Sequence, residues 1–326
     1  MTAASPTPSL PGDRPHRRLS AHTRAVLQAL LVTFLWSTSW VLIKWGLKDI
    51  PALTFAGLRY TLAFVCLLPF ALQPAPRRAL TGLPAGGWGR LALLGVLYYA
   101  VTQGAQFVGL AYLPAVTVSI LLNFTGPLVA LLGIVFLDER PSRLQWSGMA
   151  VFLGGVLLYF SPGLGGAPAA GPADGVSGRL LGMVVMALGT LANAVSAVLG
   201  RAVNRSGTLG PLPVTVSSMG VGAMVLLAGG ALAQGLPRLP LSAWLVIAWL
   251  AVVNTAAAFT LWNHTLRTLP AMESTIINST MLVQIALLAW LFLGEQLSLL
   301  QAVGMALVAA GAVLVQLRRL PRRAGG

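Results

Sequence analysis

A stretch of 49 residues occurs twice in this sequence, at positions 110–158 and, without a gap, at positions 266–314. The offset is a constant 156 residues, and nineteen of the 49 aligned pairs are identical. The identical pairs include polar residues and glycines: Glu139 with Glu295, Ser142 with Ser298, Gln145 with Gln301, Gly148 with Gly304, and Gly155 with Gly311. An apolar composition alone does not produce so many matches in register. The sequence therefore predicts a fold built from two copies of one ancestral unit.

Long apolar runs follow one another along the chain, separated by short polar connections. Hydrophobic residues make up 56% of the sequence and charged residues 9%, and the mean hydropathy is +0.82, so a surface suited to water cannot be assembled. A helix that crosses a bilayer needs about 20 apolar residues. Ten runs fit, near positions 25–44, 52–72, 90–111, 116–137, 144–160, 180–200, 212–233, 243–262, 272–293 and 300–317. We expect an all-α integral membrane protein with ten transmembrane helices in a lipid bilayer.

The connections divide the chain into two halves and indicate its orientation. We expect a disordered cytoplasmic tail at 1–24, five-helix repeats at 25–160 and 179–317, an extracytoplasmic linker at 161–178 and a basic cytoplasmic tail at 318–326. Because each repeat has an odd number of helices, the second enters the membrane from the opposite side, as an inverted repeat. With the N-terminus in the cytoplasm, sixteen of the 21 Lys and Arg residues lie on the inner side, in agreement with the positive-inside rule. Both termini are therefore predicted to be cytoplasmic.

Charge, cysteine and histidine content exclude several other classes of protein. The formal net charge is +14, but the cations lie between apolar spans instead of on a polar face with aromatic residues, so no nucleic-acid partner is expected. The one cysteine, Cys66, allows no intramolecular disulfide, and the three scattered histidines lack the spacing of a metal site. No reactive group with a neighbouring base is found. We expect no catalytic residue, metal or cofactor, and hence no enzyme.

Polar residues within the apolar spans mark candidate sites. Arg59 lies about seven residues from the predicted outer end of its span, where it could bind a substrate carboxylate or phosphate, snorkel outward or pair with a structural acceptor. Polar and large amphipathic side chains recur in six other spans: Trp36, Ser37, Ser39, Trp40, Tyr98, Tyr99, Asn123, Asn193, Asn254 and Asn278. Each could bond a neighbouring helix, but together they favour a central cavity for a small-molecule substrate. The repeat sets Tyr98 opposite Asn254 and Tyr99 opposite Thr255.

Three glutamates near the ends of spans have a structural and a functional interpretation. Glu139 and Glu295 precede helices that start with Ser-x-x-Gln, the spacing of a capping box, and the helix dipole favours a carboxylate there. Glu273 follows Leu-Pro-Ala and fits an ordinary helix start. The alternative for all three is a role in gating or proton coupling. The repeated glycines, seven residues apart, predict close helix packing.

These motifs together resemble the drug/metabolite transporter superfamily, specifically the ten-helix exporters built from two EamA-type repeats. The resemblance covers positions 25–317, and its most specific parts are Phe-Leu-Asp-Glu-Arg at 136–140, Phe-Leu-Gly-Glu at 292–295, Trp-Ser-Thr-Ser-Trp at 36–40, and Arg59-Tyr60. Ser37 replaces the usual glycine of the family. Val283 stands where the first copy has Pro127, so the sequence does not support a helix bend in the second copy. The resemblance implies an alternating-access carrier in the cytoplasmic membrane, commonly for amino acids or related metabolites.

The leading hypothesis is a secondary transporter that exports small metabolites, either amino acids or related neutral or anionic solutes. Trp36, Tyr98 and Asn254 would contact the substrate, and Arg59 would counter an anionic group. The first span has no carboxylate, which argues against the small multidrug cation antiporters that the resemblance also suggests. The alternatives are a multidrug or nucleotide-sugar-type carrier of the same fold and, outside transport, a membrane scaffold or a lipid-modifying enzyme. The protein is expected to be a monomer or homodimer in the inner cell membrane.

Overall fold

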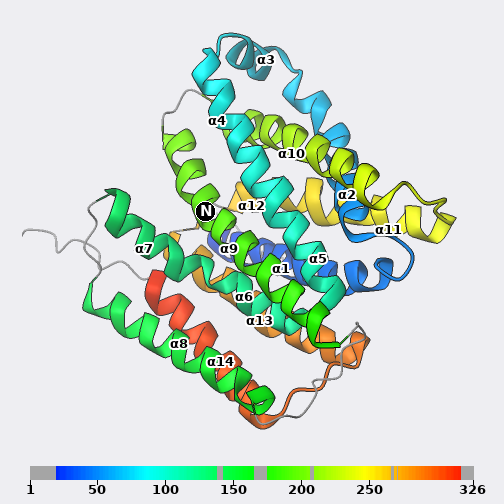
Figure 1. The fold of residues 1–326 in the computed structure, drawn as a ribbon. Helices are drawn as coiled ribbons and strands as arrows, with labels where there is room; N and C mark the ends of the chain where they lie inside the picture. Colours follow the sequence, from blue (N-terminus) through cyan, green and yellow to red (C-terminus); the bar gives the residue numbers. More distant parts are fainter. Residues whose placement is uncertain are drawn as a thin grey trace, which may run out of the picture.

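Helices are the regular secondary structure of the computed structural model, which describes residues 20–137, 142–164, 175–205, 209–265, 268–269 and 271–316 (Figure 1). The first half contains α1 (Ala21–Gly46), α2 (Ala52–Ala71), α3 (Pro74–Thr81), α4 (Ala85–Gly95), the π-helical segment η1 (Val96–Gln103), α5 (Gly104–Tyr112), α6 (Ala115–Asn123), α7 (Thr125–Leu137) and α8 (Arg143–Leu164). The second half contains α9 (Gly175–Arg205), α10 (Pro211–Gln234), α11 (Leu241–Ala251), the π-helical segment η2 (Val252–Ala257), α12 (Ala258–Thr265), α13 (Ala271–Leu293) and α14 (Leu299–Gln316).

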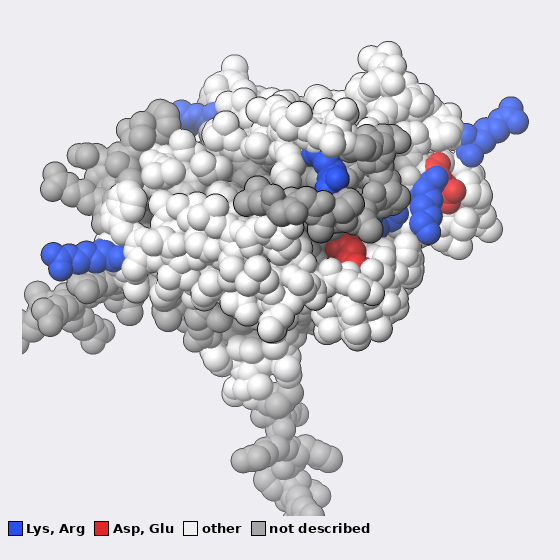
Figure 2. Space-filling model, turned by 60° about the horizontal axis from the view of Figure 1, so that its bottom comes forward, with Lys and Arg blue, Asp and Glu red and all other residues white. Residues whose placement is uncertain are grey.

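The helices have the length and composition of membrane spans. Among the described residues, eight helices are long and apolar enough to cross a membrane, and two shorter apolar helices, Thr280–Leu293 and Leu299–Leu314, fall on the last two predicted spans. Large apolar side chains such as Leu157 and Trp290 are exposed, and the face drawn in Figure 2 is mostly uncharged. The all-helical membrane architecture is confirmed, while the count of ten crossings stays a prediction.

Several helix ends differ from those predicted. α1 begins at Ala21, inside the predicted tail, because the Ser20 hydroxyl caps it by accepting from the Thr23 backbone N–H at 3.0 Å. α8 and α9 both extend into the predicted linker at 161–178, and the third span begins at Ala85 rather than at position 90. The short helix α3 was not predicted. Residues 1–19 and 317–326 lie outside the described part of the chain.

One bend distinguishes the two copies of the repeat. α6 ends at Asn123 and α7 begins at Thr125, because Pro127 has no N–H to donate to the Asn123 carbonyl four residues earlier. α13 runs without interruption through Val283, the equivalent position. The predicted difference between the copies is confirmed.

The predicted capping boxes are present at the start of both final helices of the repeats. The backbone N–H of Ser142 donates to Oε1 of Gln145 at 2.9 Å, and the Gln145 N–H donates to Oγ of Ser142 at 3.3 Å. Ser298 and Gln301 make the same two bonds at 3.0 and 3.2 Å. These recurring polar residues therefore define where α8 and α14 begin.

Glycines bring α8 and α14, the last helices of the two repeats, into backbone contact. A Cβ added at Gly155 would lie 2.6 Å from the backbone N of Val308, and one added at Gly304 would lie 2.6 Å from the backbone N of Tyr159. Figure 1 shows the two helices side by side at one edge of the bundle. The predicted packing role of these glycines is confirmed.

The second helices of the two repeats, α2 and α10, approach each other in the same way. A Cβ at Gly57 would lie 2.7 Å from the backbone N of Leu227, and a Cβ at Gly230 would lie 2.6 Å from the backbone N of Thr54. The two halves are thus joined through two pairs of equivalent helices.

Replacing Gly155 with alanine is expected to lower the thermal unfolding midpoint in detergent, because overpacking a close contact costs about 1–3 kcal/mol. Gly154 is the matched control, since a Cβ there meets nothing within 4 Å. Gly154→Ala should leave the midpoint unchanged or raise it, because alanine is favoured in a helix by up to about 1 kcal/mol. Equal midpoints for the two variants would contradict the packing described.

Candidate functional site

Two short π-helical segments interrupt the third and eighth spans at matching positions. η1 and η2 begin 156 residues apart, the offset of the sequence repeat. The hydroxyl of Thr102 donates to the Leu97 carbonyl, and that of Thr255 donates to the Leu250 carbonyl, each at 2.8 Å and each five residues back along the chain. Such segments occur frequently at functional sites. The sequence did not predict them, although the aligned residues Tyr99 and Thr255 both lie within them.

Arg59 on α2 connects the first repeat to the π-helical segment of the second. Its side chain is 5% exposed, and its Nε donates a hydrogen bond to Oγ1 of Thr255 at 3.1 Å. The guanidinium carbon lies 5.2 Å from the ring centre of Tyr60 and 5.9 Å from that of Phe107, within the range of cation–π attraction. One hydrogen bond and two aromatic rings therefore hold this buried cation.

No carboxylate pairs with Arg59 among the residues whose side chains the structure describes. Those residues include two acidic ones, Asp49, which is exposed, and Glu295, which bonds the backbone of α6. The guanidinium makes no second hydrogen bond to a described residue, and a buried charge without partners is costly. Its remaining planar N–H groups match the oxygens of a carboxylate or phosphate in a two-point geometry. The position is therefore suited to an anion.

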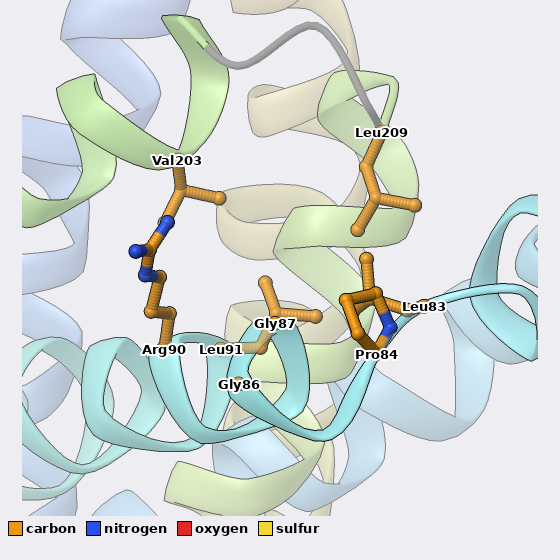
Figure 3. Close-up of a pocket in the computed structure, with 8 residues that line it drawn as sticks. All are labelled: Leu83, Pro84, Gly86, Gly87, Arg90, Leu91, Val203 and Leu209. Carbon is orange, nitrogen blue, oxygen red and sulfur yellow. The ribbon is translucent and has the colours of Figure 1, made fainter.

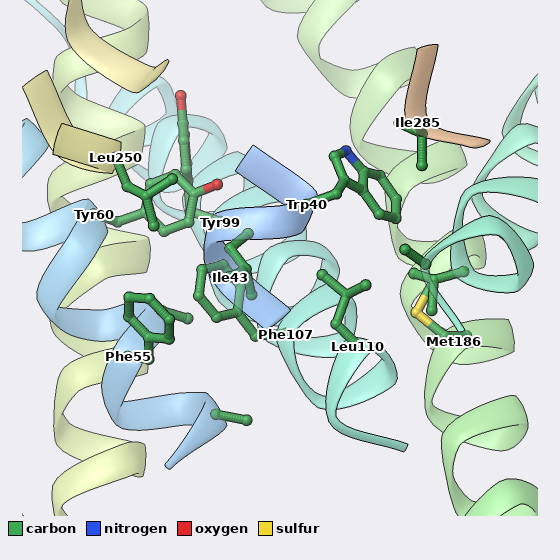
Figure 4. Packing of buried hydrophobic residues seen from close by; sticks show 14 of the residues in the cluster. Trp40, Ile43, Phe55, Tyr60, Tyr99, Phe107, Leu110, Met186, Leu250 and Ile285 are labelled. Carbon is green, nitrogen blue, oxygen red and sulfur yellow. The ribbon is translucent and has the colours of Figure 1, made fainter. Parts of the chain in front are cut away.

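Tyrosine rings surround this position. Tyr60 donates its hydroxyl to Oε1 of Gln103 at 2.7 Å, and Tyr99 contacts the rings of Tyr60 and Tyr98 with centroids 5.5 and 4.8 Å apart. Figure 4 shows Tyr60, Tyr99 and Phe107 within one cluster. Because the rings exclude water, they strengthen the electrostatic attraction between the guanidinium and an anion.

The structure thus brings three predicted site residues together, Arg59, Tyr98 and Tyr99. The sequence did not single out Gln103, Phe107 or Thr255 as site residues. The sequence repeat could have identified Thr255 as a site residue, because it aligns Thr255 with the predicted site residue Tyr99.

A second polar position lies where η2 and α12 pack on α1. Asn254 is fully buried, and its amide nitrogen donates to the backbone of α1 and to the Thr38 hydroxyl at 3.1 Å. The ring of Trp36 lies 5.3 Å from those of both Phe259 and Trp262. Within the described structure, Oδ1 of Asn254 and Nε1 of Trp36 are buried without a partner. Buried polar groups normally have a hydrogen-bond partner. Of these two predicted residues, Asn254 therefore offers a ligand one acceptor and Trp36 offers one donor.

A glutamine that was not predicted holds α1 against α13. Ser37 donates its hydroxyl to Oε1 of Gln284 at 3.0 Å, and Nε2 of Gln284 donates to the hydroxyls of Thr33 at 3.2 Å and Thr280 at 3.1 Å. Ser37, a predicted substrate residue, is therefore part of an interhelical network of the kind common in membrane proteins.

The other predicted substrate residues bond within the fold, pack in the core or are exposed. Ser39 and Asn123 donate to carbonyls of their own helices at 3.3 and 2.8 Å, and Asn193 donates to a hydroxyl of α7 at 2.9 Å. Trp40 lies in the apolar core (Figure 4), and Asn278 is exposed on α13. None of these contacts involves Arg59.

Of the three predicted glutamates, one has a side chain that the structure describes. Glu295 accepts the backbone N–H of Ala115 at 2.7 Å through Oε1 and that of Val116 at 3.3 Å through Oε2. This corrects the interpretation from sequence, because the carboxylate stabilises the N-terminus of α6 and not that of the following helix α14. Glu139 lies outside the described residues, and Glu273 lies on α13 where side chains are not described.

A cavity of about 250 Å³ lies at the end of the bundle where α4 begins (Figure 3). Its walls are formed by Leu83, Pro84, Gly86, Gly87, Arg90 and Leu91 of the first half and by Val203 and Leu209 of the second. None of the predicted substrate residues lines this cavity. Beside it, Leu91 of α4 packs with Val203 of α9 and with Leu209 and Val214 in one buried apolar cluster.

Comparison with known proteins finds relatives over most of the chain. The EamA-like transporter family matches residues 23–161 and again 180–317. The chain is 24% identical over 289 residues to the uncharacterized inner membrane transporter YedA of Escherichia coli, covering 87% of each protein. It is 28% identical over 297 residues to a probable amino-acid metabolite efflux pump of Salmonella typhimurium, covering 87% of this chain and 91% of that protein. A crystal structure with 19% identity superimposes with a TM-score of 0.62 over 90% of this chain and 96% of the other, which supports the fold.

Replacing Arg59 with methionine is expected to leave the unfolding midpoint unchanged or to raise it, because an uncompensated buried charge gives way to an apolar chain. Arg90→Met is the control, since Arg90 is exposed and surface changes usually alter stability by less than about 0.5 kcal/mol. A loss of about 3–5 kcal/mol in Arg59→Met, as when a buried ion pair is broken, would show that the guanidinium already has an anionic partner.

Proposed function

Because the chain belongs to the EamA-like transporter family, we propose that it exports small metabolites with an anionic group, amino acids or related solutes, across the cytoplasmic membrane. In the proposed topology ten helices form two inverted five-helix repeats, and both termini are cytoplasmic. Inverted repeats allow one midplane site to face each side of the membrane in turn. The distribution of Lys and Arg along the sequence supports this orientation.

The observation that carries this proposal is the contact between Arg59 and Thr255. A cation with no described acidic partner lies where the second helix of one repeat meets the π-helical segment of the other. If the repeats move relative to each other, the surroundings of the guanidinium change with them. A substrate anion at this position would offset the cost of the buried charge and would be sensitive to the conformation of the carrier.

The second polar position supports a substrate with further hydrogen-bonding groups. Asn254 is adjacent to Thr255 in η2, and its unpaired Oδ1 can accept a hydrogen bond from a substrate N–H. The unpaired Nε1 of Trp36 can donate to a substrate oxygen. An amino acid has groups of both kinds, and the similarity to the probable amino-acid metabolite efflux pump of Salmonella typhimurium supports this substrate class.

Transport by purified protein in liposomes tests the proposal. Radiolabelled amino acids and matched analogues in which an amide replaces the carboxylate are compared, with and without a pH gradient. Carboxylate solutes should be transported and the amides should not. Arg59→Gln should lower the rate by about tenfold or more, because hydrogen bonds to charged groups contribute about 1.5–3 kcal/mol. Thr255→Val should lower it by about fivefold, because Thr255 orients the guanidinium.

Arg78→Gln is the control for the loss of one positive charge, because Arg78 is exposed on the short helix α3 and does not line the cavity in Figure 3. It should transport at the wild-type rate. Transport of lipophilic cations alone, or equal transport by Arg59→Gln and the wild-type protein, would exclude the proposed substrate class.

A further inference from the structure

Side chains of the second repeat cap two helix N-termini of the first. Glu295 accepts the N–H groups of Ala115 and Val116, the first two residues of α6. Gln234, the last residue of α10, accepts through Oε1 the N–H groups of Leu53 at 2.8 Å and Thr54 at 3.4 Å in the first turn of α2. Each cap therefore crosses from one repeat to the other.

These two N-termini have no side-chain cap of their own. The residue before α2 is Pro51 and the residue before α6 is Pro114, and neither provides a side-chain hydrogen bond. The first N–H groups of a helix have no partner inside it, so α2 and α6 depend on the second repeat or on water. Separation of the repeats at this end would exchange both caps for water, which makes the contacts reversible.

Both caps lie at the same end of the bundle. Lys44, in the last turn of α1, interacts electrostatically with Glu295, and the ring of Trp45 lies 6.1 Å from that of Phe292 at the end of α13. The chain passes from α1 through a short turn to the start of α2, which Gln234 caps. The first repeat is thus held to the second at this end by both capping side chains.

A cavity lies at the other end of α10. α10 begins beside Leu209, which lines the cavity in Figure 3, and ends at Gln234. The cavity and the caps are therefore at opposite ends of α10. The repeats are joined by the two polar caps at one end and, at the other, by apolar contacts beside a cavity of about 250 Å³.

We propose that Glu295 and Gln234 form an outer latch, which holds the two repeats together at the extracytoplasmic end and must release during each transport cycle. This inference rests on the proposed function for its orientation and cycle. The latch stabilises the outward-closed state, because the caps form only when the repeats meet at that end. Loss of either cap shifts the population toward the state in which the outer end is open.

The latch is tested first by access from outside the cell. Cys66→Ala removes the one native thiol, and Ala115→Cys places a reporter where the side chain is fully buried. An impermeant thiol reagent should label the cysteine at position 115 about five to thirty times faster when Glu295→Ala is added. This factor corresponds to the free energy that a typical helix cap contributes. Gln234→Ala should have an effect of the same sign, and Glu295→Gln a smaller one, since its amide keeps one acceptor oxygen.

Ser298→Ala is the matched control, because it removes an N-cap contact that lies within α14 and crosses no repeat boundary. It should leave labelling at position 115 unchanged. Only variants with the wild-type elution profile on size exclusion are compared, and Glu295→Gln, the least disruptive, decides the result if Glu295→Ala does not fold. Unchanged labelling in the Glu295 variants, or an equal increase in Ser298→Ala, would overturn the latch.

A second measurement asks whether release is required for transport. In the same background, a short bifunctional thiol reagent joins Ala115→Cys to Glu295→Cys, and each single cysteine variant treated with the reagent is the control. The joined protein should transport at least about tenfold more slowly than the same variant without the reagent. The reagent should not change the transport rate of either single cysteine variant. Full transport by the joined protein would overturn the latch. If labelling responds as expected but no tested solute is transported, the proposed substrate class fails and the latch stands.

Discussion

The hydrogen bond from Arg59 to Thr255 is the contact on which the proposed function depends. It places the only described buried guanidinium at the meeting point of the two repeats. A charge in an apolar bundle must be compensated by something, and the described residues supply one hydroxyl and two aromatic rings. Tyr60 and Phe107 contact the guanidinium, η2 supplies Thr255, and α2, which carries Arg59, packs closely against α10.

The repeat has two distinct physical roles. Where its copies agree, the shared residues are caps and glycines: Ser298 and Gln301 start α14 as Ser142 and Gln145 start α8. Two positions where its copies differ are polar in η2: Asn254 has an oxygen without a described partner, and Thr255 bonds a residue of the other half. Thr255 bonds Arg59, while its equivalent Tyr99 is part of the aromatic wall. The residues that the copies share therefore define the scaffold, and the pair Tyr99 and Thr255, in which they differ, lies at the proposed site.

Hydropathy and the repeat predicted the helical membrane architecture, the glycine contacts and the bend at Pro127, because these depend on local composition and on one residue's missing N–H. The partners of Arg59 and Glu295 could not be predicted in the same way. They come from segments about 180–200 residues distant in the chain, and periodicity within a helix does not determine which faces meet. The π-helical segments were also missed, because the apolar periodicity that places the spans does not distinguish a π-helical turn from an α-helical one.

Ligand-induced stabilisation of the purified protein tests most directly whether Arg59 is an anion site. A ligand that binds the folded state and not the unfolded one raises the unfolding midpoint, and the increase grows with the ratio of its concentration to its dissociation constant. The account predicts that carboxylate solutes raise the midpoint of the wild-type protein, that their amide analogues do not, and that neither shifts Arg59→Met. Equal stabilisation of the wild-type protein and Arg59→Met by the same carboxylate solute would contradict it.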